Sequence, residues 1–231
     1  MTEVYLEAGK RRVFACAPEW PGWCRPGRDE GSALAALAAY APRYAEVCAR
    51  AGVPFEAGPA AAGFEIVERV TGSATTDFGA LDVAPALDGE PGTAQQTERL
   101  VTLVETAWDL FEQTAADAPA VLRRGPRGGG RDRDAIVAHV RETEVLHARM
   151  LGLNERPFPA TDAAALARVR AGILAGVRAG AVARPPADLA RSRRPARFVA
   201  RRIAWHALDH TWEIEDKRDP QRHRSRVGGH R

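Results

Sequence analysis

Two histidines stand four residues apart in the stretch Trp205-His206-Ala207-Leu208-Asp209-His210-Thr211-Trp212-Glu213. Residues at this spacing lie one turn apart on the same face of an α-helix. The face is otherwise apolar, because helical spacing continues it through Val199, Ile203, His206, His210 and Ile214. The stretch therefore predicts a helix whose histidines face the interior of a helical bundle.

Histidines inside a bundle need polar partners, since burying an unpaired polar group costs free energy. One such partner is a metal ion, because two imidazoles at this spacing can bind one ion from one helix. The other is hydrogen bonding within the bundle, which explains the pattern without a metal. The spacing of His206 and His210 alone leaves both interpretations open.

A third candidate ligand is His139, on a helix predicted over residues 134–151, where it lies beside Ile136 and Val140 on the apolar side. One histidine from this helix and two from the last would give three neutral nitrogen ligands. Such a set leaves a coordination position open to water or substrate, as catalytic metal sites do. His147 lies near the edge of the same face, and we expect it to be partly exposed and not to bind the ion.

The segment Asp134-Ala135-Ile136-Val137-Ala138-His139-Val140, followed by Arg202-Ile203-Ala204-Trp205-His206-Ala207-Leu208-Asp209-His210, resembles the DinB-like superfamily. Members of that superfamily are four-helix bundles in which one histidine of the second helix and an HxxxH pair of the last hold a metal. The resemblance covers residues 93–217. It implies that His139, His206 and His210 bind a divalent metal. Zinc and nickel are expected, since imidazole suits both.

The resemblance also implies a small-molecule substrate and an activity. Some relatives transfer groups to or from low-molecular-weight thiols such as mycothiol or bacillithiol, and others isomerise or hydrolyse their substrates. The chain is therefore expected to be a thiol-dependent transferase or a hydrolase. The alternative is a non-catalytic, metal-containing binding or stress-response protein.

Three neutral ligands would leave the ion doubly charged, able to lower the pKa of bound water toward ~7 or to activate a thiolate. The predicted bundle contains no cysteine, so a thiol nucleophile would have to come from a cosubstrate. Helical proximity makes Asp209, Glu213 and Glu142 candidates for orienting the histidine rings by hydrogen bonds. Ordinary surface charges are the alternative for each of the three.

Composition limits the class of protein. The 231 residues can form one large or two small domains. The net charge of +3 comes from an arginine-rich chain, in which only Lys10 and Lys217 are lysines, and aromatic residues do not interleave its arginine clusters. We therefore expect no nucleic-acid partner.

No run approaches the roughly 18 apolar residues of a membrane span, and the N-terminus has no signal-peptide pattern, so a cytoplasmic location is expected.

The three cysteines, Cys16, Cys24 and Cys48, show no CxxC spacing. Their number is odd, which leaves at least one thiol unpaired within the chain. In a cytoplasmic protein this pattern is typical of reduced, structural thiols. We therefore expect all three to be free.

Residues 1–80 predict a small β-β-α-β module. Two β-prone runs, residues 4–7 and 12–16, flank a hairpin signal; a helix follows over residues 32–51, bent at Pro42, and residues 64–70 alternate as a half-buried strand does. The turn Pro21-Gly22-Trp23 before an Ala- and Leu-rich helix resembles the HicB-like module. This resemblance implies no catalytic residue. The module is expected to contribute a homodimer contact or a lid if the chain is an enzyme, and dimerisation or partner binding if it is not.

The sequence as a whole predicts an α+β chain in which the small module precedes a four-helix bundle. Residues 72–92 are predicted to form a long loop, of which residues 81–92 are the linker. The basic tail, residues 218–231, is predicted to be disordered. The bundle helices are expected at residues 93–117, 134–151, 162–183 and 195–217.

Overall fold

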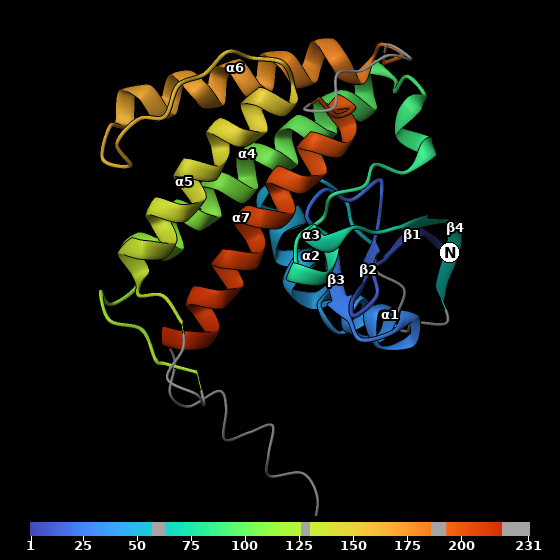
Figure 1. The fold of residues 1–231 in the computed structure, drawn as a ribbon, viewed down its shortest axis with the longest axis horizontal. Coiled ribbons are helices and arrows are strands. Elements are labelled where there is room, and N and C mark those ends of the chain that lie inside the picture. Colours follow the sequence, from blue (N-terminus) through green and yellow to red (C-terminus); the bar gives the residue numbers. More distant parts are fainter. Residues whose placement is uncertain (57–62, 126–129, 186–192, 219–231) are drawn as a thin grey trace, which may run out of the picture.

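The computed structural model describes residues 1–56, 63–125, 130–185 and 193–218, and the chain has an α+β architecture (Figure 1). A four-stranded sheet precedes a set of long helices. The strands are β1 (Thr2–Ala8), β2 (Val13–Cys16), β3 (Cys24–Gly27) and β4 (Phe64–Thr71). The short helices are α1 (Glu30–Ala39), α2 (Ala41–Arg50), α3 (Ala74–Phe78) and the 3₁₀ helix η2 (Ala86–Gly89); the long ones are α4 (Ala94–Ala116), α5 (Arg133–Met150), α6 (Ala163–Ala181) and α7 (Ala196–Arg218).

The strand order is β3-β2-β1-β4, with β1 antiparallel to β2 and parallel to β4. Strand β3 was not predicted, because Pro26 and Gly27 are poor strand residues. It lies at the edge of the sheet, where a proline is tolerated. The helix predicted over residues 32–51 is divided into α1 and α2, since Pro42 occupies the first turn of α2.

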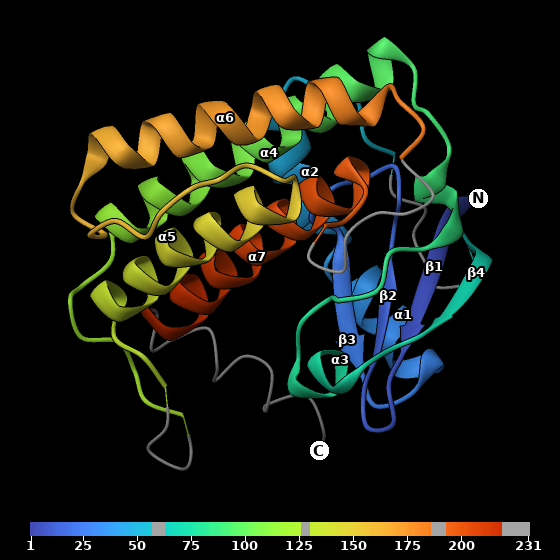
Figure 2. The same ribbon diagram turned by 45° about the horizontal axis from the view of Figure 1, so that its top comes forward.

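The long helices begin and end within two residues of the predicted bounds. Their starts carry clear signals: Thr93 forms a capping box with Gln96 before α4, and Asp162 caps α6. Helix α7 packs against α4, α5 and α6, and α6 also contacts α4 and α5 (Figures 1 and 2). None of the helices in the described part of the chain has the length and apolar character needed to cross a bilayer.

The sheet module packs directly on α7. Phe14 of β2 contacts the Trp205 ring at 5.6 Å between centroids, and Tyr40 contacts Trp212 at 5.0 Å. Gly22, with φ of 92°, brings its turn so close to α7 that a Cβ there would lie 2.5 Å from the Leu208 side chain. Buried side chains of the sheet module and of the long helices belong to one hydrophobic cluster. Separate folding of residues 1–80 and 93–217 stays a prediction.

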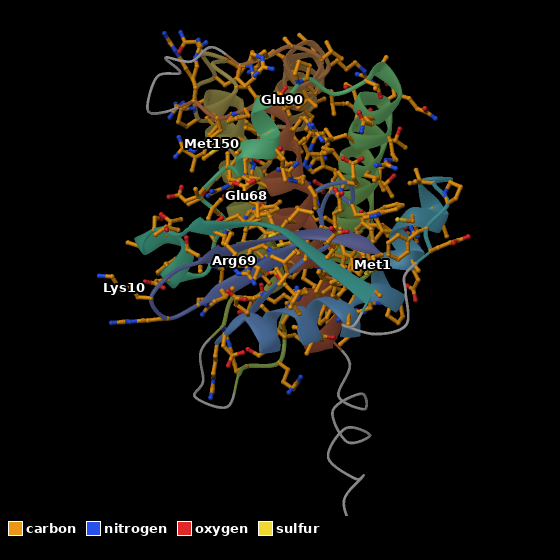
Figure 3. All side chains as sticks on the ribbon, turned by 90° about the vertical axis from the view of Figure 1, so that its right-hand side faces the viewer. Met1, Lys10, Glu68, Arg69, Glu90 and Met150 are labelled. Atoms are coloured by element: carbon orange, nitrogen blue, oxygen red, sulfur yellow. A yellow bond between two sulfur atoms is a disulfide. The ribbon has the colours of Figure 1, made fainter. Side chains whose placement is uncertain are left out.

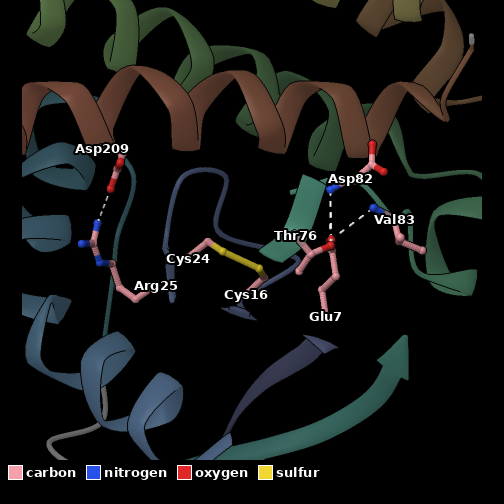
Figure 4. Close-up of a disulfide and its surroundings, with 8 residues drawn as sticks. All are labelled: Glu7, Cys16, Cys24, Arg25, Thr76, Asp82, Val83 and Asp209. Carbon is pink, nitrogen blue, oxygen red and sulfur yellow. Dashed lines mark hydrogen bonds and ion pairs between the residues drawn. A yellow bond between two sulfur atoms is a disulfide. The ribbon is translucent and has the colours of Figure 1, made fainter. Parts of the chain in front are cut away.

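Residues 72–92 are not the structureless loop that was predicted. They contain α3 and η2, and Glu7 of β1 explains why they are ordered. The buried Glu7 carboxylate accepts hydrogen bonds from the Thr76 hydroxyl and from the backbone N–H groups of Asp82 (3.1 Å) and Val83 (3.3 Å) (Figure 4). Glu68 of β4 accepts another from Ala86 N at 2.7 Å, on the side of the molecule shown in Figure 3.

The expectation of three free thiols is wrong for two of them. Pairing of β2 with β3 places Cys16 directly opposite Cys24, and the two form a disulfide (Figure 4). Cys48 is free and buried in α2, where burial raises the pKa of its thiol to about 12. The predicted tail beyond residue 218 and most of the glycine run at residues 125–130 lie outside the described residues.

A buried ion pair connects the segment before α4 to α7. The Arg201 guanidinium contacts Asp88, and these side chains are 4% and 0% exposed. We expect Asp88→Ala to lower the free energy of unfolding by about 3–5 kcal/mol, because it leaves a buried charge without its partner.

Glu90→Ala is the matched control, since the Arg184–Glu90 pair is 67% and 63% exposed and should contribute at most about 1 kcal/mol. Urea denaturation of both variants measures the difference. Equal, small losses would contradict the assignment of the Arg201–Asp88 pair as a structural contact.

Candidate metal centre

Packing of α5 against α7 brings three histidines together. His139 comes from α5, and His206 and His210 come from consecutive turns of α7. One ring nitrogen of each lies within 4.8 Å of the others. The Nε2 atoms of His139 and His206 are 3.2 Å apart, and the three ring centroids are separated by 4.8 to 5.1 Å. Three nitrogen donors thus converge on one small space.

Glu213 fixes the orientation of the His210 ring. Nδ1 of His210 lies 2.7 Å from the Glu213 carboxylate, which also accepts a hydrogen bond from Lys217 Nζ. Burial alone would raise the pKa of Glu213, but the contacts with His210 and Lys217 hold it down to about 2. An ionised carboxylate at Nδ1 favours the tautomer that carries its proton there, so the Nε2 lone pair faces the cluster.

The rings of His139 and His206 are neutral at physiological pH. Burial, followed by the nearby His210, lowers the pKa of His139 to about 4. Burial also lowers the pKa of His206 well below 6.5, with its histidine neighbours adding to the effect. Metal ligation requires unprotonated imidazole, so His139 and His206 can bind a divalent ion without a prior change of protonation.

The other predicted site residues lie in different surroundings. The Asp209 carboxylate accepts a hydrogen bond from Arg25 Nη1 of β3 at 2.7 Å, and therefore connects α7 to the sheet (Figure 4). Glu142 is exposed on α5 and lines a cavity that His139 also lines. In the described part of the chain, Glu142 has no hydrogen bond to a histidine ring. Of the three carboxylates, only Glu213 contacts a ring of the cluster.

His147 is not the partly exposed residue that was expected. Its side chain is 1% exposed, and its ring lies 5.9 Å from that of His206 between centroids. Neither ring nitrogen has a hydrogen-bond partner among the described residues. Burial, with a contribution from Arg202, lowers its pKa to about 3. The periodicity of α5 alone could not show this, because both α6 and α7 cover that helix.

One histidine of the cluster, His139, borders a cavity. This cavity, of about 390 Å³, lies along α5. Its volume falls within the range of small-molecule sites, roughly 300–1,000 Å³. A molecule bound there would therefore lie next to one of the three histidines.

No protein-family model, curated protein or solved structure matches this chain. The resemblance to the DinB-like superfamily and the HicB-like module therefore stays a prediction, and the chemistry of the site is argued from its own residues.

Replacement of His147 by leucine tests whether this residue belongs to the centre. We expect His147→Leu to raise the free energy of unfolding at pH 7 by about 1 kcal/mol, because two unpaired buried nitrogens are replaced by apolar atoms. Metal content should not change. Chemical denaturation and elemental analysis measure both, and loss of metal would show that His147 takes part in the centre.

The same variant should change how stability depends on pH. The folded pKa of His147, about 3, lies below its ordinary value of 6.5. Stability from this group is therefore present above pH 6.5 and is lost as the pH falls toward 3. Denaturation of the metal-free proteins at pH 7 and pH 5 should show a smaller loss in His147→Leu than in the unaltered chain.

Proposed function

We propose that α4 to α7 form a four-helix bundle of the DinB-like type and that His139, His206 and His210 hold one divalent metal, zinc or nickel. The convergence of three ring nitrogens from two helices within 4.8 Å carries this proposal. The neutrality of His139 and His206 supports it, and so does the Glu213 contact at Nδ1 of His210, since metal-bound imidazoles usually donate their second N–H to such a group.

An ion held by three neutral ligands supplies a Lewis acid that lowers the pKa of a bound water or thiol. Among the described residues the chain offers no free thiol near the cluster, because Cys16 and Cys24 are joined and Cys48 is buried in α2. The attacking group would therefore be water or an external thiol. We accordingly propose a thiol-dependent transferase or a hydrolase acting on a small molecule.

Charge pairing supports the proposal that nucleic acid is not the partner. Many arginines in the described ranges bind carboxylates of the same chain, and this leaves their charge largely neutralised. Examples from both halves are Arg43 with Glu215, Arg141 with Glu112, and Arg170 with Glu144.

One observation favours the alternative, a non-catalytic protein in which the sheet module binds a second copy of the chain. Strand β4 lies at the edge of the sheet and carries the exposed Val67. Such an edge presents unpaired backbone groups to another strand. This homodimer proposal concerns the module and does not exclude a metal in the helical half.

Metal analysis tests the ligands. Purified protein should carry about one divalent ion per chain, and His206→Ala should lose most of it. Glu213→Gln should keep the ion with about 10–100-fold lower affinity, because the His210 ring loses its charged partner. Glu142→Gln, whose carboxylate contacts no histidine ring, serves as the control. Unchanged metal content in His206→Ala would refute the ligand assignment.

Calorimetry tests the reaction class. Low-molecular-weight thiols should bind the metal-loaded protein and should bind His206→Ala far more weakly, because the thiolate is stabilised by the ion. Duplex DNA and single-stranded RNA are titrated at moderate salt in parallel. Salt-sensitive binding of nucleic acid without thiol binding would favour a binding protein instead.

A further inference from the structure

One face of α5 lies outside the hydrophobic core and forms the wall of the cavity beside the histidines. Five side chains follow helical spacing along it: His139, Glu142, Thr143, Leu146 and Arg149. The opposite wall is formed by the chain between α5 and α6, which runs back along α5 (Figure 2). This cavity is called the α5 groove below.

Two hydrogen bonds hold the opposite wall in place. Arg141 Nη1 of α5 donates to the carbonyl of Ala160 at 2.6 Å, and Arg149 Nε donates to the carbonyl of Glu155 at 3.0 Å. Phe158, between these anchors, packs against the core of the protein. The groove is therefore built from a helix and a fixed segment.

The middle of the groove is apolar. Val145, Leu146, Pro157 and Phe158 line it, and Leu146 is 52% exposed. Few large apolar side chains of the described residues are exposed to this extent. An exposed apolar patch with polar groups at its ends is typical of a ligand site.

The two ends of the groove differ in charge. Arg149 stands at one end, ten residues along α5 from His139, roughly 15 Å of helix. Unlike Arg141 and Arg170, Arg149 has no ion pair with any described residue, so its terminal guanidinium nitrogens can bind a ligand carboxylate. Glu142 lies at the His139 end and repels an anion there.

We propose that the α5 groove binds an elongated monocarboxylic acid. The carboxylate pairs with Arg149, the apolar body packs on Leu146 and Phe158, and the uncharged end points toward His139. Use of the groove as a substrate pocket rests on the proposed function, whereas the binding itself needs no metal.

Calorimetric titration with butanoate, hexanoate, octanoate and decanoate tests the proposal. Affinity should rise about fourfold with each added methylene that the groove buries. Arg149→Gln should weaken octanoate binding at least about tenfold, because a charge-assisted hydrogen bond is lost. Arg156→Gln, an exposed arginine outside the groove lining, is the matched control and should bind as the unaltered chain does.

Further titrations distinguish binding in the α5 groove from binding at the proposed metal. Leu146→Asn should flatten the dependence on chain length, and octylamine should bind much more weakly than octanoate. His206→Ala, which lacks the metal ligand, should retain octanoate binding. Absence of binding in all proteins, or binding that Arg149→Gln leaves unchanged, would overturn the proposal. If only His206→Ala abolished binding, the carboxylate would lie at the histidines, and the assignment to Arg149 would be wrong.

Discussion

The rest of the structure depends on α7, which is buried between the other long helices and the sheet module. The helix packs against α4, α5, α6, η2 and the sheet module, so polar side chains on several of its faces are removed from water. A buried polar group must be paired or it costs stability. The buried Arg201 pairs with Asp88, His206 contacts His139, and His210 contacts Glu213. The partly exposed Asp209 binds Arg25. Three of these pairings connect α7 to other parts of the chain: Asp88 lies before α4, Arg25 in β3 and His139 in α5.

The elements that could be predicted are those whose signals are local. Helix starts at Thr93 and Asp162 follow from capping side chains, and the break between α1 and α2 follows from Pro42. The features that could not be predicted arise from distant contacts. Residues 72–92 are ordered by Glu7, which lies far away in the sequence, and Cys24 meets Cys16 only because a strand containing Pro26 joins the sheet edge.

The candidate site likewise combines features that follow from local sequence with features that depend on distant contacts, and α7 carries both. His206 and His210 share a face of α7 because of helical periodicity alone. The same periodicity places Glu213, three residues after His210, in contact with its ring. Asp209 has the same helical proximity, yet Arg25, 184 positions away in the sequence, binds it instead. The burial of His147 likewise depends on two helices packing over α5. Sequence pattern therefore gives the candidate ligands, while tertiary packing decides which side chains contact them.

In the metal-free protein the three rings can satisfy one another only in part. His139 and His206 can satisfy one donor and one acceptor by their 3.2 Å contact, but three nitrogens that face one space cannot all be paired by each other. Protonation does not relieve this, because burial holds the pKa of His206 well below 6.5. A ligand that binds only the folded state would add to the stability of that state through linkage. The cluster therefore has a place for a Lewis acid that would complete the pairing of its nitrogens, and this is the physical ground on which we propose a function for it.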